Sequence, residues 1–148
     1  MDQFEQVDIL LVEDNPYDAE LTLRSLRQKN LANHVEWLQD GAEAVDFIFC
    51  RNAHEGRKGQ PLPKLILLDI KLPKLNGIEV LKTIKGDAVT KLIPVVMLTS
   101  SAEDRDLIAC YEYGVNSYIV KPVNFEKFGE EVSKAGFYWM LMNRLPPR

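Results

Sequence analysis

Short apolar runs alternate along this chain with stretches that carry apolar residues at helical spacing. Nearly continuous apolar runs are typical of strands that are covered on both faces of a sheet. Strict alternation of such strands with amphipathic helices predicts an α/β fold with a parallel sheet. The predicted strands are Val7–Val12, His34–Leu38, Leu65–Leu68, Pro94–Leu98 and Ser117–Val120, of which His34–Leu38 alternates and is expected at an edge.

Helix start and stop residues separate these strands. Asn15 followed by Pro16 is a typical helix start, and Gly114 suits the residue that follows a helix end. Ser100 and Glu103 have the spacing of a capping box. We expect the segment 51–64 to be a long solvated loop. The predicted helices run from Asn15 to about Lys29, from Asp40 or Gly41 to Phe49, and over Gly77–Lys85, Ala102–Tyr113 and Asn124–Asn143.

Composition limits the function classes. The chain has 148 residues and a net charge of −4, which suits one domain and argues against nucleic acid or an anionic membrane as partner. No apolar run approaches the length of a membrane span, the acidic start is no signal peptide, and the two cysteines lack metal-ligand spacing. We therefore expect a single cytoplasmic domain over 1–148, with 124–148 forming the last helix and an apolar tail. The segment after Asn124 is too short for a DNA-binding output module.

Polar residues that could take part in catalysis or ligand binding follow four of the predicted strands. Glu13 and Asp14 follow the first strand, Asp69 the third, Thr99 the fourth and Lys121 the fifth. Ligands of open parallel sheets bind beyond the carboxyl ends of the strands, so these side chains are expected at one edge.

Each residue also has an ordinary structural explanation. Thr99 and Asp14 are residue types that cap helices, and a lysine after a strand is usually a solvated end. However, Asn15 and Ser100 are placed to fill the cap positions, and Asp69 lies too far before Gly77 to cap the next helix. Taken together, the residues favour a site over four separate coincidences.

The charges indicate the chemistry. Three neighbouring carboxylates repel one another, and a hard cation such as Mg²⁺ relieves that repulsion. Lys121 and Thr99 can bind anionic oxygens. The set suits phosphoryl transfer onto a carboxylate, with the central Asp69 as nucleophile.

At this point a resemblance to a known family is clear. The segments LLVEDNP, LLDIKLPKLNG, MLTS and YIVKP resemble the landmarks of the receiver domain of two-component response regulators, in order and in spacing. The similarity spans about Val7 to Val132. It implies a flavodoxin-like (βα)5 doubly wound parallel sheet with strand order 2-1-3-4-5. The protein would be a phosphoacceptor signalling protein and not an enzyme in the usual sense.

The resemblance also implies residue roles. Asp69 would accept phosphate from a histidine kinase. Mg²⁺, or Mn²⁺ as a substitute, would be held by Asp14, Asp69 and the backbone carbonyl of Lys71, with Glu13 acting through water. Thr99 and Lys121 would bind the phosphoryl oxygens, and the Lys121–Pro122 peptide would be cis.

Departures from the commonest receivers point to a subfamily. Glu13 stands where aspartate is more frequent, and Leu75–Asn76–Gly77 replaces Met-Asp-Gly but still suggests a turn. The long loop, the DIKLPKLNG turn and the aromatic C-terminus are similar to those of stand-alone receivers paired with cyanobacterial phytochromes. That likeness implies a phytochrome-type kinase as donor and an unknown protein as downstream target.

Two further expectations concern output. Phosphorylation is expected to draw Thr99 toward the phosphoryl group and to bias Tyr118, an aromatic on the fifth strand, inward; an ordinary strand aromatic is the alternative. The last helix has more apolar residues than one inward face can use. We expect a homodimer surface formed by Phe137, Tyr138, Met140 and Leu141, the alternative being a tail folded over the core.

Three other functions compete with this one. A flavodoxin-type electron carrier needs a hydroxyl- and glycine-rich loop, where this chain has EDNPYD. An aspartyl-phosphate hydrolase needs a second acid where Lys71 stands. A receiver-like scaffold that is never phosphorylated needs no complete site, and it remains the alternative.

Overall fold

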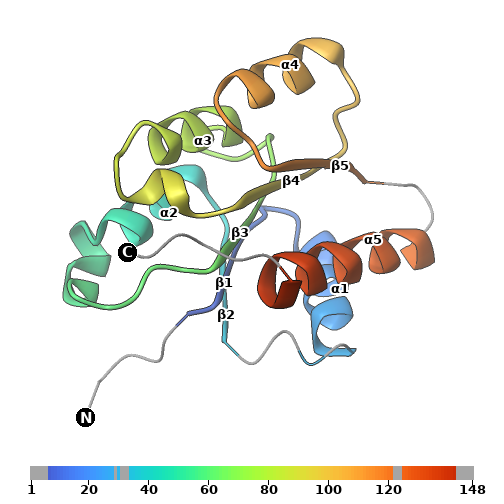
Figure 1. Ribbon diagram of the computed structural model, residues 1–148, viewed down its shortest axis with the longest axis horizontal. Coiled ribbons are helices and arrows are strands. Elements are labelled where there is room, and N and C mark those ends of the chain that lie inside the picture. Colours follow the sequence, from blue (N-terminus) through green and yellow to red (C-terminus); the bar gives the residue numbers. More distant parts are fainter. Residues whose placement is uncertain (1–6, 29, 31–33, 122–124, 143–148) are drawn as a thin grey trace.

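The computed structural model describes residues 7–28, 30, 34–121 and 125–142. Five parallel strands form one sheet in the order β2-β1-β3-β4-β5, which confirms the predicted fold and the edge position of β2 (Figure 1). The strands are β1 (Ile9–Val12), β2 (Val35–Leu38), β3 (Leu65–Leu68), β4 (Val95–Thr99) and β5 (Ser117–Val120). The helices are α1 (Pro16–Gln28), α2 (Gly41–Phe49), α3 (Gly77–Lys85), α4 (Asp104–Glu112) and α5 (Phe125–Phe137).

Alternate residues of the central strands point into two separate cores. Leu10, Leu68 and Met97 face α2, α3 and α4, whereas Leu11 and Leu67 face α1 and α5. Both sets are almost fully buried. Because side chains alternate along a strand, a continuous apolar run is what a sheet covered on both faces requires.

Helix ends follow local sequence rules at most positions. The Asn15 side chain accepts hydrogen bonds from the backbone N–H groups of Tyr17 and Asp18, and Asp40 and Asn76 cap α2 and α3 in the same way. Gly114 has a φ of 93°, as expected for the residue after a helix end.

The predicted capping box before α4 is wrong. The helix begins at Asp104, and Glu103 at its N-cap makes no side-chain cap bond. Ser101, not Ser100, carries the polar contacts of this turn: its hydroxyl lies 2.6 Å from an Asp106 carboxylate oxygen. Ser101 is buried against the end of the sheet, whereas Ser100 is exposed, so tertiary contact decided which serine is used.

The long segment between α2 and β3 is only partly the solvated loop that was expected. It contains a 3-10 helix, Asn52–Arg57, and Arg57 is buried with its guanidinium 3.8 Å from the centre of the Phe47 ring. Cation–π contact and a buried aliphatic stem explain why a basic side chain packs inward here.

The C-terminal helix changes its winding near its end. After α5 the chain continues as a π-helical segment, Tyr138–Met142. Trp139 and Met140 pack partly against the α1/α5 core, whereas Tyr138 is 49% exposed. The wider π turn brings Met140, expected on the outer side, toward the core. The side chains of Phe137 and Leu141 and the position of Asn124 lie outside the described residues.

Among the described residues, no helix combines the length and the apolar character that crossing a membrane requires.

Candidate functional site

Three carboxylates meet beyond the carboxyl ends of β1 and β3. One oxygen each of Glu13, Asp14 and Asp69 lies within 4.8 Å of the others. Glu13 and Asp69 are buried, while Asp14 is exposed. The parallel register, with Val12 beside Leu68, brings the residues that follow these two strands to the same edge.

The backbone around Asp69 fixes its carboxylate. The Asp69 N–H donates to the Val12 carbonyl at 3.1 Å, and its Oδ1 accepts from the Ile70 N–H at 2.7 Å. Gly77 packs against this turn so closely that a Cβ atom there would lie 1.9 Å from the Asp69 carbonyl oxygen. A glycine is therefore required at position 77 by close approach.

Glu13 is held from several directions although it is only 3% exposed. Its carbonyl accepts from the Trp37 indole N–H at 2.8 Å, and its carboxylate accepts from the Asn15 N–H at 3.2 Å and from Lys121. Burial, and next the negative charge of Asp69, raise the pKa of Glu13 to about 7, while Lys121 acts in the opposite direction.

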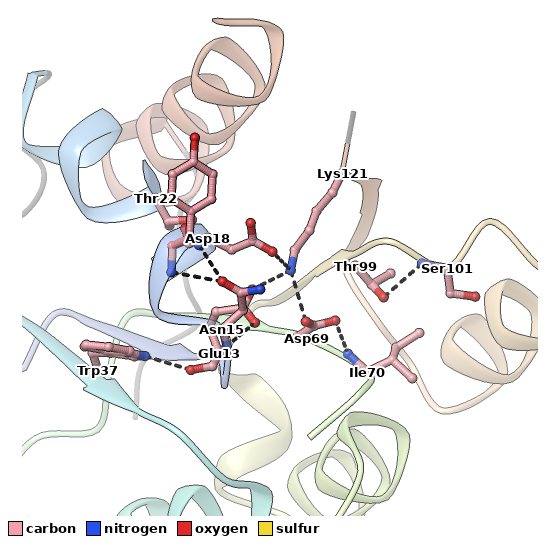
Figure 2. A network of polar contacts seen from close by, with 11 residues as sticks. Glu13, Asn15, Asp18, Thr22, Trp37, Asp69, Ile70, Thr99, Ser101 and Lys121 are labelled. Atoms are coloured by element: carbon pink, nitrogen blue, oxygen red, sulfur yellow. Dashed lines mark hydrogen bonds and ion pairs between the residues drawn. The ribbon is translucent and has the colours of Figure 1, made fainter. Parts of the chain in front are cut away.

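Lys121 is the cation of this site (Figure 2). Its ammonium contacts the carboxylates of Glu13, Asp18 and Asp69, at 2.9 Å from Asp18 and 3.0 Å from Asp69. Burial alone would lower the pKa of Lys121, but the hydrogen bond to Glu13 and the charge of Asp69 raise it above its ordinary value. Lys121 therefore stays protonated at the end of β5.

Thr99, at the end of β4, and Tyr118, on β5, both contact Ser101 in the turn that follows β4. The buried Thr99 hydroxyl accepts from the Ser101 N–H at 3.2 Å, so it forms a local turn and does not cap α4. The Tyr118 hydroxyl donates to the Ser101 carbonyl at 2.9 Å, and its ring packs partly against the α2–α4 core. The backbone N–H of Lys121 donates to the Thr99 carbonyl at 2.7 Å.

The structure therefore brings Glu13, Asp14, Asp69, Thr99 and Lys121 to one sheet edge, while their roles remain predictions. Lys71 is exposed on the turn after Asp69, and the role of its carbonyl also remains a prediction. The Lys121–Pro122 peptide, predicted to be cis, lies outside the described residues.

Asp18 is a member of the polar network to which the sequence had assigned no role. An acid in the first turn of a helix is explained by the helix dipole alone, which hides any second role. Only the tertiary structure, in which the Lys121 side chain reaches the first turn of α1, places it against Lys121.

The acid cluster fits a divalent metal. Its donors are carboxylate oxygens, the ligands that Mg²⁺ and Mn²⁺ prefer, and the exposed Asp14 leaves an open side for water or phosphate oxygens. The four carboxylates at this edge outnumber the single ammonium of Lys121, so the local charge favours a cation.

Comparison with known proteins agrees with the fold. The response regulator receiver domain model matches residues 9–133. The chain is 44% identical over 138 residues to the probable methanogenesis regulatory protein FilR2 of Methanothrix harundinacea, covering 93% of this chain and 86% of that protein. It is 38% identical to the response regulator Rcp1 of Synechocystis, covering 93% of this chain and 92% of Rcp1.

Solved structures of response regulators have the same fold as this chain. The Mn²⁺-bound form of Rcp1 aligns with a TM-score of 0.86 over 97% of this chain and 100% of that one. The phosphorylated cyanobacterial phytochrome response regulator RcpA aligns with a TM-score of 0.87 at 34% identity, again over 97% of this chain and 100% of that one. With its five-stranded parallel sheet and its acid-and-lysine edge, this chain belongs to the response regulator receiver domain family.

Proposed function

We propose that this protein is a stand-alone response regulator of a phosphorelay, with residues 1–148 forming one cytoplasmic receiver domain that accepts a phosphoryl group on Asp69. The observation that carries the proposal is the Lys121 ammonium, 3.0 Å from the Asp69 carboxylate and beside a carboxylate cluster that can hold a metal. A carboxylate that is buried, fixed by its backbone and placed between a cation and a metal site is positioned as a phosphoryl acceptor.

The transfer step follows from this arrangement. An Asp69 carboxylate oxygen attacks phosphorus, the phosphorus–nitrogen bond of the donor phosphohistidine breaks, and the bond pair returns to the imidazole. The product is an acyl phosphate on Asp69, and attack by water later releases inorganic phosphate and restores the carboxylate. Lys121 and Thr99 bind phosphoryl oxygens as charge moves onto the protein.

A metal would complete the charge balance. Asp14, Asp69 and the Lys71 carbonyl would hold Mg²⁺ or Mn²⁺, with Glu13 contributing through water. When bound there, the ion would supply positive charge that offsets the charge of the phosphoryl oxygens. The chain's own contribution is to hold the Lys121 ammonium beside the Asp69 carboxylate, through its contacts with Glu13 and Asp18.

Intact mass spectrometry tests this proposal directly. The protein is incubated with acetyl phosphate, with Mg²⁺ or with a chelator, beside the Asp69→Asn variant. We expect a single phosphoryl adduct that requires Mg²⁺ and is absent from the variant. An unmodified wild-type protein would instead support the phosphate-independent scaffold.

We also propose a phytochrome-type histidine kinase as phosphoryl donor. Support comes from the similarity to RcpA, which is described as a phytochrome response regulator, along nearly the whole chain. FilR2, which is also similar to this chain, is named as a regulator of methanogenesis and not as a phytochrome partner. Because only one of these two names points to a phytochrome kinase, a phosphotransfer assay decides the assignment. Labelled phosphate should move from an autophosphorylated phytochrome kinase to the wild type within minutes, and not to Asp69→Asn. Transfer from an unrelated sensor kinase alone would reject the phytochrome assignment.

The proposed output is docking of another protein to a surface that phosphorylation changes. Thr99 and Tyr118 are the proposed switch, and both already contact Ser101. Phosphorylation should change amide hydrogen exchange in α4 and β5 of the wild type. The same change in Tyr118→Ala would show that Tyr118 does not transmit it.

Homodimerisation through the C-terminal helix is part of the same proposal. The surface expected from the sequence comprises Phe137, Tyr138, Met140 and Leu141. Tyr138 is half exposed, whereas Met140 packs partly against the α1/α5 core, so the proposal depends mainly on Tyr138. Light scattering should show a dimer whose fraction rises with concentration and falls in Tyr138→Glu. A monomer at every concentration, with and without phosphorylation, would reject the surface.

A further inference from the structure

Asp18 contacts the site from outside the carboxylate cluster that can hold a metal. Its Oδ2 lies 2.9 Å from the Lys121 ammonium, and its side chain is 27% exposed. Figure 2 shows it reaching from the first turn of α1 toward Lys121, on the side away from Thr99. The two residues are 103 positions apart, so helix formation alone does not require the contact.

The contacts that Asp18 makes within α1 do not use its side-chain carboxylate. Its N–H donates to the Asn15 side chain and its carbonyl accepts from the Thr22 hydroxyl, and both bonds use backbone atoms. A first-turn acid also interacts favourably with the helix dipole, but that interaction needs no partner on β5.

The ammonium of Lys121 has three donors, and in this structure three carboxylates take them. A phosphoryl oxygen can therefore contact Lys121 only after one carboxylate gives up its place. Asp69 is the residue that is modified, and Glu13 belongs to the acid cluster. Asp18 is the remaining competitor, and its negative charge also opposes an incoming anionic phosphodonor.

We propose that Asp18 is a positioning residue that competes with the phosphoryl group for the Lys121 ammonium and so slows phosphorylation of Asp69. The inference rests on the proposed phosphoacceptor function. In Asp18→Asn the side chain keeps its shape and an acceptor but loses its charge, so a phosphoryl oxygen competes better for the ammonium. We expect the rate constant of phosphorylation by acetyl phosphate to rise by roughly three- to tenfold, as one charge at this distance allows.

Glu20→Gln is the matched control. Glu20 lies on the same helix and its loss changes the net charge equally, but it is exposed and pairs with Arg24 and Arg27. Its substitution should change the rate constant by less than about twofold, because exposed charges are screened. Thermal unfolding of both variants checks that each is folded.

A double-mutant cycle separates positioning from a general charge effect. In a Lys121→Gln background, Asp18→Asn should give no acceleration, whether that background reacts slowly or not at all. An acceleration that persists there would overturn the inference, since Asp18 would then act without Lys121. Equal rates for wild type and Asp18→Asn would also overturn it. A wild type that takes up no phosphate at all would instead reject the proposed phosphoacceptor function.

Discussion

Two lysines at opposite ends of the sheet have ammonium groups with three acceptors each. Lys121, after β5, contacts three carboxylates. Lys85, at the end of α3, contacts three neutral oxygens near the amino ends of β4 and β5. These are the carbonyls of Lys91 and Ile93 and the Asn116 side chain, at 3.0, 2.8 and 3.0 Å.

The difference between the two lysines lies in charge. Burial lowers the pKa of Lys85 to about 8, and its acceptors are neutral. Burial acts in the same direction on Lys121, but its carboxylate neighbours raise its pKa. At Lys85, neutral acceptors accept all three hydrogen bonds of an ammonium that connects α3 to the segments before β4 and β5. Carboxylates in excess of the lysine make an edge that gains from a bound cation.

Removing Lys121 should have the largest effect on stability. In Lys121→Met three carboxylates lose their shared cation, and we expect the metal-free protein to lose about 3–5 kcal/mol in free energy of unfolding at pH 8. Saturating Mg²⁺ should recover part of the loss, because it replaces the missing positive charge. Urea unfolding with and without Mg²⁺ measures both. An identical loss with and without Mg²⁺ would show that the contribution of Lys121 to stability does not depend on the metal site.

Gly77→Ala should be nearly as damaging, through sterics. Its Cβ would lie 1.9 Å from the Asp69 carbonyl oxygen, and backbone atoms cannot move aside as a side chain can. We expect a loss of about 3 kcal/mol, at the upper end for overpacking, together with slower phosphorylation. Gly129→Ala is the control, because its nearest contact is the Ser25 hydroxyl at 3.0 Å. Equal unfolding midpoints for the two variants would refute the steric explanation.

Lys85→Met should cost less, and Mg²⁺ should not recover the loss. The substitution leaves the Lys91 and Ile93 carbonyls without a donor but leaves no uncompensated charge. A loss of about 1–3 kcal/mol is expected, as for unpaired polar groups. Urea unfolding should give the same difference from wild type with and without Mg²⁺. A Mg²⁺-dependent difference would show that the two ends of the sheet are coupled.

The two ends should also respond to pH with opposite sign. Without metal, the pKa of Glu13 rises from 4.5 to about 7, so the folded state binds more protons and its stability falls as pH increases through that window. The pKa of Lys85 falls from 10.5 to about 8, so stability rises with pH between those values.

Each slope is limited to about 1.4 kcal/mol per pH unit for one proton. Urea unfolding in chelator should show the first slope flattened in Glu13→Gln and the second in Lys85→Met. If Glu13→Gln flattened the alkaline slope instead, the assignment of these protons would be wrong.

Sequence patterns predicted the fold because each strand and most helix ends depend on local rules. Apolar runs placed Leu65–Leu68 and Ser117–Val120 with the bounds that the structure has, and Asn15 capped α1 as expected. The site residues were found because parallel strands end at one edge, so their following residues meet.

The failures occurred where distant contacts decide. Ser101 makes the polar contacts expected of Ser100 because Ser101 is the buried one of the two. Arg57, expected in a solvated loop, is buried and packs on the Phe47 ring. Asp18 was missed because its sequence neighbours explain it fully, and its partner lies 103 residues away.

The sequence by itself determined the order of strands and helices, the two-sided burial of the sheet, and which polar residues follow the strands. These properties depend on periodicity and on short-range capping, which the chain carries locally. Only the tertiary structure decided that Lys121 is shared among Glu13, Asp18 and Asp69, that Gly77 must lack a side chain, and that Met140 turns inward. Those features depend on distances between segments far apart in the chain, which no local pattern contains.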